Sequence, residues 1–198
     1  YTPETPEDED AYRAMQGRPA PFIEIRARNA ETGIVAWDGE AMGELEVRGP
    51  WVVGAYYHAQ DGEDRFTPDG WFRTGDLVSI HPDGCIHIRD RTKDVIKSGG
   101  EWVSSVALEN AIMGHPAVAE AAVIGVPEPK WMERPIAIVV CKPGQSVTHE
   151  ALVAFLEPQF PKWWMPDATE FVDALPKSGA GKFQKSVLRE RFAQRLQR

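Results

Sequence analysis

Residues 90–100, DRTKDVIKSGG, separate two parts of the chain that differ in hydrophobic period. Charged residues crowd the start of this stretch, and Gly99 and Gly100 end it. Before it, apolar and polar residues alternate as in strands that are buried on one face. After it, apolar residues recur at helical spacing or in unbroken runs. We therefore predict two domains, 1–90 and 91–198, with the boundary near residues 91–93.

The part before this stretch has the pattern of an antiparallel sheet. In residues 22–28, FIEIRAR, the apolar residues Ile23, Ile25 and Ala27 share one face of a strand. ELEVR, DLVSI and CIHIRD are similar short runs, and turn sequences such as ETG, TPDG and HPDG separate them. Residues 1–12 are acidic and lack an apolar period, so we expect them to be flexible.

The part after the stretch predicts a small α+β domain. Ser104 or Ser105 can cap a helix through residues 106–113 that stops at Gly114, and Thr148 can cap another over residues 149–160. Apolar runs at 120–126, 136–141 and 170–173 predict strands. A last helix over 185–198 has Leu188, Phe192 and Leu196 at helical spacing. The predicted fold class is α+β, with a mainly antiparallel β part followed by this domain.

Composition excludes several classes of protein. The chain has 198 residues, 42% hydrophobic and 26% charged, and no apolar run long enough to cross a membrane. A net charge of −8 argues against a nucleic-acid partner. Cys85 and Cys141 lie in apolar stretches and are expected to be small buried thiols of a reduced, cytoplasmic protein. The histidines have no metal-ligand spacing, so we predict no metal site.

Three clusters carry polar chemistry. The first is WFRTGDL, residues 71–77, in which Asp76 can accept hydrogen bonds from the two vicinal hydroxyls of a ribose. The alternative is an aspartate that only forms a turn. In the second, residues 89–105, Gly99 and Gly100 let the backbone approach a ligand closely, whereas the alternative is a charged linker between domains.

The third cluster is PKSGAGKFQK, residues 176–185. Lys182 follows a glycine-rich turn, which would let it reach into a site that closes on a ligand. A lysine about 4 Å from a phosphoryl charge contributes about 4 kcal/mol at an effective dielectric near 20. The alternative is a solvated lysine in a strand-to-helix turn.

In this order and spacing, RTGD, DRTKDVIKSGG and PKSGAGK resemble the motifs of the adenylate-forming superfamily, and the chain is most similar to medium- and long-chain fatty-acyl-CoA synthetases. The resemblance implies the end of a large N-terminal portion followed by a small, mobile C-terminal domain. It also implies a two-step reaction, in which a carboxylate attacks the α-phosphate of ATP to give acyl-AMP, and the thiol of CoA then displaces AMP.

The resemblance assigns roles to single residues. Asp76 is expected to bind the ribose of the adenylate and Arg91 its ribose or phosphate, while Lys93 occupies the hinge position. Lys182 is expected to bridge the substrate carboxylate and the α-phosphate in the first step. In the second step, Gly100, together with Gly99 and Lys97, is expected to face the tunnel that holds the pantetheine arm of CoA.

The resemblance also sets limits. The family's phosphate loop, adenine segment and acyl pocket belong to an N-terminal portion that this sequence lacks, so we expect a fragment that is inactive alone. ATP, Mg²⁺ and CoA are expected in the parent enzyme, and this fragment is not expected to bind Mg²⁺. A homodimer is possible. Two alternatives remain: a ligase for an aryl, amino or methylthio-alkanoic acid, and a non-enzymatic nucleotide-binding module.

Overall fold

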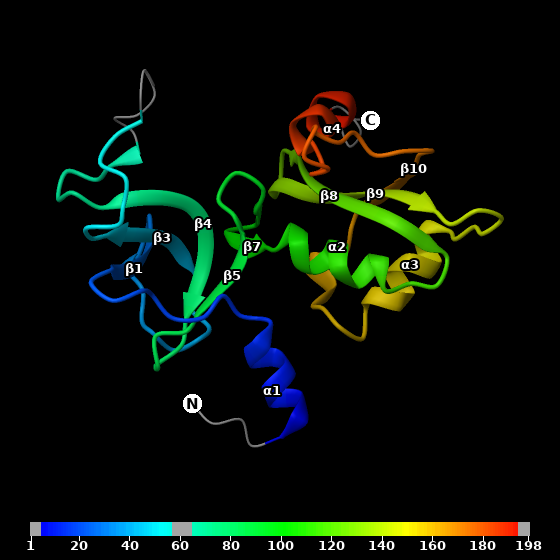
Figure 1. Ribbon diagram of the computed structural model, residues 1–198. Helices are drawn as coiled ribbons and strands as arrows, with labels where there is room; N and C mark the ends of the chain where they lie inside the picture. Colours follow the sequence, from blue (N-terminus) through cyan, green and yellow to red (C-terminus); the bar gives the residue numbers. More distant parts are fainter. Residues whose placement is uncertain (1–4, 57–64, 194–198) are drawn as a thin grey trace. The chain divides into compact units, whose positions relative to one another are not determined.

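The computed structural model describes residues 5–56 and 65–193. Within it the chain divides into the units Tyr1–Lys93 and Asp94–Arg198, each with its own sheet (Figure 1). Residues 1–4 of the segment that we expected to be flexible, and Leu196 of the predicted last helix, lie outside the described residues.

The first unit is built on a five-stranded sheet with the order β2-β1-β3-β4-β5. All its neighbouring strands are antiparallel, which confirms the predicted antiparallel part. The HPDG turn joins the last two strands, as its sequence predicts. The bounds are β1 Glu24–Asn29, β2 Gly33–Ile34, β3 Gly43–Arg48, β4 Phe72–Ile80 and β5 Ile86–Arg91.

The predicted alternation decides which face of this sheet is buried. Ile25, Ala27 and Leu45 pack together with Val78 and Ile80 in the core of the unit. The opposite face holds an exception to the simple pattern, because the carboxylate of Glu46 is buried there. Arg26 and Arg28 of the neighbouring strand form ion pairs with it, which offsets part of the cost of burying the charge, although Glu46 Oε1 accepts no hydrogen bond among the described residues.

Helix α1, Pro6–Arg13, precedes the sheet and was not predicted from the sequence. Pro6 stands at its first position, where a missing N–H costs nothing. Arg13 lies 2.6 Å from Glu9 one turn earlier. Both side chains are at least half exposed, so this pair adds only a few tenths of a kcal/mol, about 0.2–0.5.

The second unit has the predicted order of helix, strand, strand, helix, strand and helix, preceded by a hairpin that we did not predict. Strand β10 runs parallel to β9, and helix α3 makes the crossover between them. The bounds are β6 Ile96–Ser98, β7 Glu101–Val103, α2 Ser105–Met113, β8 Val118–Glu128, β9 Met132–Cys141, α3 His149–Leu156, the 3-10 turn η2 Lys162–Trp164, β10 Ala168–Phe171 and α4 Lys185–Phe192.

The caps of α2 and α3 confirm the helix starts read from the sequence. Ser104 Oγ accepts from the N–H of Ala107, and Thr148 Oγ1 accepts from the N–H of Ala151. A cap of this kind contributes about 1 kcal/mol. Within α2, Val106 and Met113 are exposed, whereas the buried apolar residues are Leu108 and Ile112.

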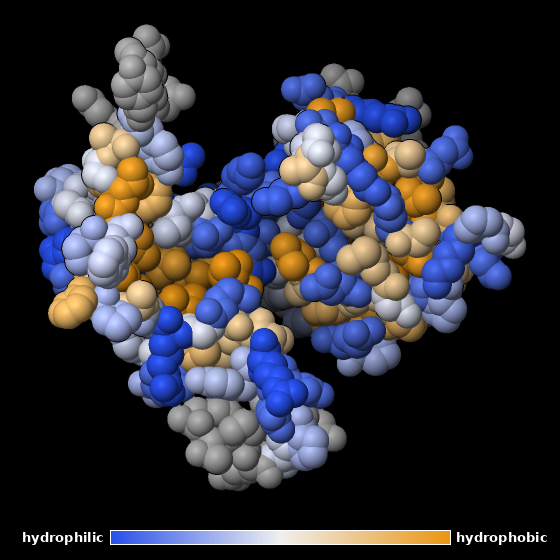
Figure 2. Space-filling model, viewed as in Figure 1, coloured by the Kyte–Doolittle hydropathy of each residue, from blue (hydrophilic) through white to orange (hydrophobic). Residues whose placement is uncertain are grey.

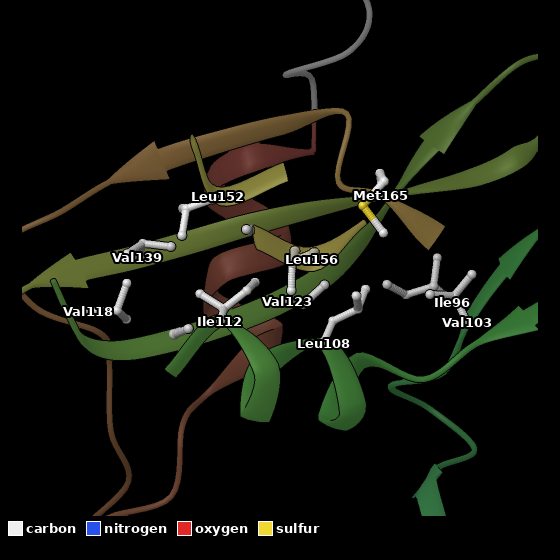
Figure 3. Packing of buried hydrophobic residues seen from close by; sticks show 12 residues of the cluster. Ile96, Val103, Leu108, Ile112, Val118, Val123, Val139, Leu152, Leu156 and Met165 are labelled. Carbon is white, nitrogen blue, oxygen red and sulfur yellow. The ribbon is translucent and has the colours of Figure 1, made fainter. Parts of the chain in front are cut away.

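Strands β8 and β9 are buried on both faces, which explains their nearly unbroken apolar sequences. On one face, α2 and α3 cover Val123 and Val139, as Figure 3 shows. On the other face, Ile124 and Ile138 pack with Leu188 of α4. The sheet of this unit therefore separates α4 from the other two helices.

The visible surface in Figure 2 mixes hydrophilic and hydrophobic residues. In the part of the chain that the structure describes, no helix combines the length and apolarity needed to span a bilayer. The two cysteines are free; Cys85 is buried as predicted, while Cys141, at the end of β9, is only partly buried.

Candidate functional site

Asp76 and Arg91, the two residues predicted to bind nucleotide, are cross-strand partners on β4 and β5. Arg91 Nε lies 2.8 Å from Asp76 Oδ1, with the aspartate side chain 20% exposed and the arginine 54% exposed. The Asp76 N–H donates to Thr74 Oγ1 at 3.1 Å, and the Thr74 hydroxyl donates to the carbonyl of Leu45. Neighbouring strands thus fix the carboxylate while leaving part of it open to a ligand.

The predicted hinge, residues 91–93, lies at the end of β5. The N–H and the hydroxyl of Thr92 both donate to the carbonyl of Gly75. These two bonds connect the turn after β5 to the TGD motif, residues 74–76. Lys93 is exposed in this turn and is the last residue of the first unit. Rotation about Lys93 stays a prediction.

Gly99 and Gly100 form the turn of the β6–β7 hairpin in the second unit. Their φ angles are +62° and +87°, a region that favours glycine. The Gly99 N–H donates to the carbonyl of Trp131, and a Cβ at this position would lie 2.8 Å from the indole ring. Lys97 is exposed on β6, and its N–H donates to the carboxylate of Glu133.

A cavity of about 430 Å³ opens beside this turn. Its wall includes Gly99, which the motifs assigned to the second step, together with two partly exposed indoles and an ion pair that the motifs did not indicate. Tertiary contact alone brings these groups together, because they lie on separate elements along the chain. The residues concerned are Trp131, Trp163, Arg134 and Asp167.

Arg134 is the fixed point of this wall. Its guanidinium bonds bidentately to Asp167, with contacts of 2.6–3.0 Å. It also donates to Ser98 Oγ and to the backbone carbonyls of Trp163 and Met165. The arginine is 9% exposed, so its donors are used in holding the β6 end and the η2 turn in place.

Lys182 lies in a hydrogen-bonded turn before α4. The Ser178 N–H donates to its carbonyl at 2.8 Å, and the Gly181 N–H donates to the carbonyl of Ser178 at 2.8 Å. Lys177 and Phe183 form a bridge that closes the turn. Among the described residues the Lys182 ammonium has no hydrogen-bond or ion-pair partner, so it is available to a ligand.

The structure therefore distributes the predicted residues over two units. Asp76, Arg91 and Lys93 belong to the first unit. The hairpin residues Lys97, Gly99 and Gly100, and the turn residue Lys182, belong to the second and lie on different elements of it.

Comparison with known proteins matches residues 107–182 to the family described as the AMP-binding enzyme C-terminal domain. Residues 107–182 thus belong to this domain family. This confirms the family resemblance that the three motifs indicated. The fold class is confirmed as well, since the mixed α+β architecture is that of solved adenylate-forming enzymes.

Relatives of this chain include acid–CoA ligases. It is 46% identical over 94% of its length to a long-chain-fatty-acid–CoA ligase of Thermus thermophilus, and 45% identical over 96% to a 3-methylmercaptopropionyl-CoA ligase of Ruegeria lacuscaerulensis. It spans 35% of the length of each, about a third.

Two solved structures share the fold. ATP-bound MatB of Rhodopseudomonas palustris aligns with a TM-score of 0.81 at 35% identity, over 91% of this chain and 36% of that one. The o-succinylbenzoate-CoA synthetase of Bacillus subtilis, in complex with its acyl-adenylate, aligns with a TM-score of 0.81 at 29% identity, over 93% and 37%.

Proposed function

We propose that this chain is part of an ATP-dependent acid–CoA ligase. The observation that carries the proposal is the ammonium of Lys182, which has no partner within residues 5–56 and 65–193 and is presented by a turn that lies partly in the matched domain. The relatives support it, since they are acid–CoA ligases, and the solved neighbours are described with ATP and with an acyl-adenylate.

In the first step, the substrate carboxylate attacks the α-phosphate of ATP, forming acyl-AMP and releasing pyrophosphate. Lys182 bridges the two anions as the bond forms. Its contribution of about 4 kcal/mol at 4 Å corresponds to about a thousandfold in rate. Asp76 accepts from the ribose hydroxyls and Arg91 contacts the ribose or phosphate. Mg²⁺ enters as MgATP, and we assign it no ligand among the described residues.

In the second step, the CoA thiol attacks the acyl carbonyl and AMP leaves. The turn of Gly99 and Gly100, with Lys97 beside it, faces the pantetheine arm. The cavity next to Gly99 supports this role, because it offers room and two indole faces at that turn. Because Lys182 and the glycine turn belong to one unit but serve different steps, the unit rotates about Lys93 between them.

The acid is a fatty acid in our first proposal and a methylthio-alkanoic acid in our second. The first follows the Thermus long-chain and the Ectopseudomonas oleovorans medium-chain ligases. The second follows the 3-methylmercaptopropionyl-CoA ligases, which are equally similar to this chain.

The test uses a full-length ligase that carries this sequence. Acid-dependent ATP–pyrophosphate exchange is measured with fatty acids of increasing length and with 3-methylmercaptopropionate, and thioester formation is measured from supplied acyl-AMP. Lys182→Ala is expected to abolish exchange and to spare thioester formation, while Lys142→Ala, an exposed lysine of the same unit, leaves both unchanged. Equal loss of both steps in Lys182→Ala contradicts the assignment. The 198-residue chain alone is expected to show no exchange.

A further inference from the structure

Lys185, the first residue of α4, has a largely buried side chain whose ammonium group contacts α2. Its Nζ lies 2.7 Å from Glu109 Oε1 and 2.7 Å from Ser105 Oγ. The side chains of Lys185 and Glu109 are only 11% and 10% exposed. Removing two charges from water is costly, so such a pair is weak evidence for stability alone.

Helix α4 itself does not account for a lysine at this position. The N-terminus of a helix carries partial positive charge, which a cation opposes. The first turn of α4 has no acidic residue, and its N-cap, Gln184, makes no side-chain capping bond. The ion pair with Glu109 therefore outweighs the unfavourable position of a cation at the N-terminus of the helix.

Glu109 is held by the sheet as well as by its helix. The N–H of Val123 in β8 donates to Glu109 Oε1 at 2.7 Å. Since α2 covers one face of the sheet and α4 the other, the Lys185–Glu109 pair joins both helices at β8. Through Glu109, Lys185 is thus linked to β8 in the buried core of the unit.

The turn that carries Lys182 is held at both of its stems. Lys177 on the first stem lies 2.5 Å from Glu120, but this pair is exposed to solvent, with side chains 41% and 33% accessible. Lys185 follows the second stem, where the Gln184 N–H donates to the carbonyl of Pro176. Of these two ion pairs, it is Lys185–Glu109 that is buried enough to escape the solvent and salt screening that weakens an exposed pair.

We propose that Lys185 is a positioning residue for Lys182, and that its pair with Glu109 fixes the place of the turn, residues 176–184. The inference rests on the proposed role of Lys182 in adenylate formation. A misplacement of a reacting group by about 1 Å can cost about 100-fold in rate. Loss of the pair should therefore impair the step that uses Lys182 and spare the step that does not.

The test compares Lys185→Met, the double variant K185M/E109Q and the control Lys177→Met in a full-length ligase that carries this sequence. In the double variant the amide oxygen of residue 109 still accepts from Val123 and no unpaired charge is buried, so the fold is kept. We expect Lys185→Met and the double variant to lower ATP–pyrophosphate exchange at least tenfold. Thioester formation from supplied acyl-AMP should stay within twofold, and Lys177→Met should keep both steps within twofold. Double-variant exchange within twofold of wild type overturns the inference.

A second readout needs no activity. In the 198-residue chain, amide hydrogen exchange at Gly181 and Gln184 is expected to rise at least tenfold in K185M/E109Q and to stay within threefold in Lys177→Met. Unchanged protection of these amides overturns the inference even where activity falls, because the turn has then not moved. A wild-type ligase without acid-dependent exchange refutes the proposed function instead, while the amide readout still decides whether Lys185 positions the turn.

Discussion

The guanidinium of Arg91 lies on the carboxylate of Asp76, Nε to Oδ1 at 2.8 Å, across two strands whose Cα atoms are partners at this position. The arginine is the more exposed of the two, 54% against 20%. A negative charge that is already paired and partly buried keeps its orientation while part of its side chain stays exposed. That arrangement suits a carboxylate that accepts hydrogen bonds from neutral hydroxyls.

Replacing Asp76 by Ala is therefore expected to lower the affinity of the full-length ligase for AMP by 10- to 100-fold. The reason is the loss of charge-assisted hydrogen bonds, which contribute about 1.5–3 kcal/mol each. Calorimetric titration with AMP measures the change. Glu24→Ala breaks a comparable exposed pair with Arg48 in the same sheet and should stay within twofold. Equal effects of the two substitutions would show that Asp76 has no contact with the nucleotide.

Acid should weaken the contact between Arg18, which precedes the sheet of the first unit, and Asp83 in the turn between β4 and β5. The hydrogen bond from Arg18, and one from the N–H of Cys85, lower the pKa of Asp83 to about 2. A lowered pKa stabilises the folded state above the unfolded value of about 4, and this contribution is lost as pH falls toward 2. The urea midpoint of the wild type should exceed that of Asp83→Asn at pH 6, and the difference should shrink by pH 2.5. A constant difference would contradict the linkage.

The sequence was sufficient where one period extended over a whole element. Strand β1 alternates cleanly, and the unbroken apolar runs of β8 and β9 follow from burial on both faces. The hairpin β6–β7 escaped prediction because its strands have three residues each, too few to show a period. Helix α1 was missed because its sequence is acidic and has no apolar face to dock.

The site was predicted only as far as its motifs reach. Asp76, Lys182 and the two glycines could be proposed as site residues because each stands in a short local pattern. Arg134 stands in no such pattern, yet it is buried and donates to Asp167, to Ser98 of β6 and to Trp163 of η2. Lys185 and Glu109 lie far apart in sequence, and only the packing of α4 and α2 at β8 shows that they pair.

Met132→Gly is expected to stabilise the second unit by about 0.5–1 kcal/mol. Met132 has a φ of +73° and is 64% exposed, so it stores backbone strain of about 1–2 kcal/mol without gaining burial. The greater freedom of glycine in the unfolded chain offsets about 0.5–1 kcal/mol of the relief. Urea unfolding of the 198-residue chain gives the free energy.

Met113→Gly is the matched control for this prediction. Met113 is also partly exposed, but it lies at the end of α2, where glycine costs about 1 kcal/mol. The two substitutions should thus act in opposite directions. A destabilisation by both would mean that the backbone at Met132 is not strained.

Gly99→Ala should destabilise the second unit more than Gly100→Ala, although the two glycines are neighbours in one turn. Each substitution places a side chain at positive φ, which costs about 1–2 kcal/mol. At Gly99 the new methyl would also lie 2.8 Å from Trp131 Cε3, whereas at Gly100 it meets nothing within 4 Å. Because the indole is 43% exposed, it can move aside, but doing so displaces it from the cavity wall. Removing the indole should therefore abolish the difference: in a Trp131→Ala background, urea unfolding is expected to give equal losses for both substitutions. A difference that persists without the indole would place its cause in the backbone of Gly99 and not in the contact with Trp131.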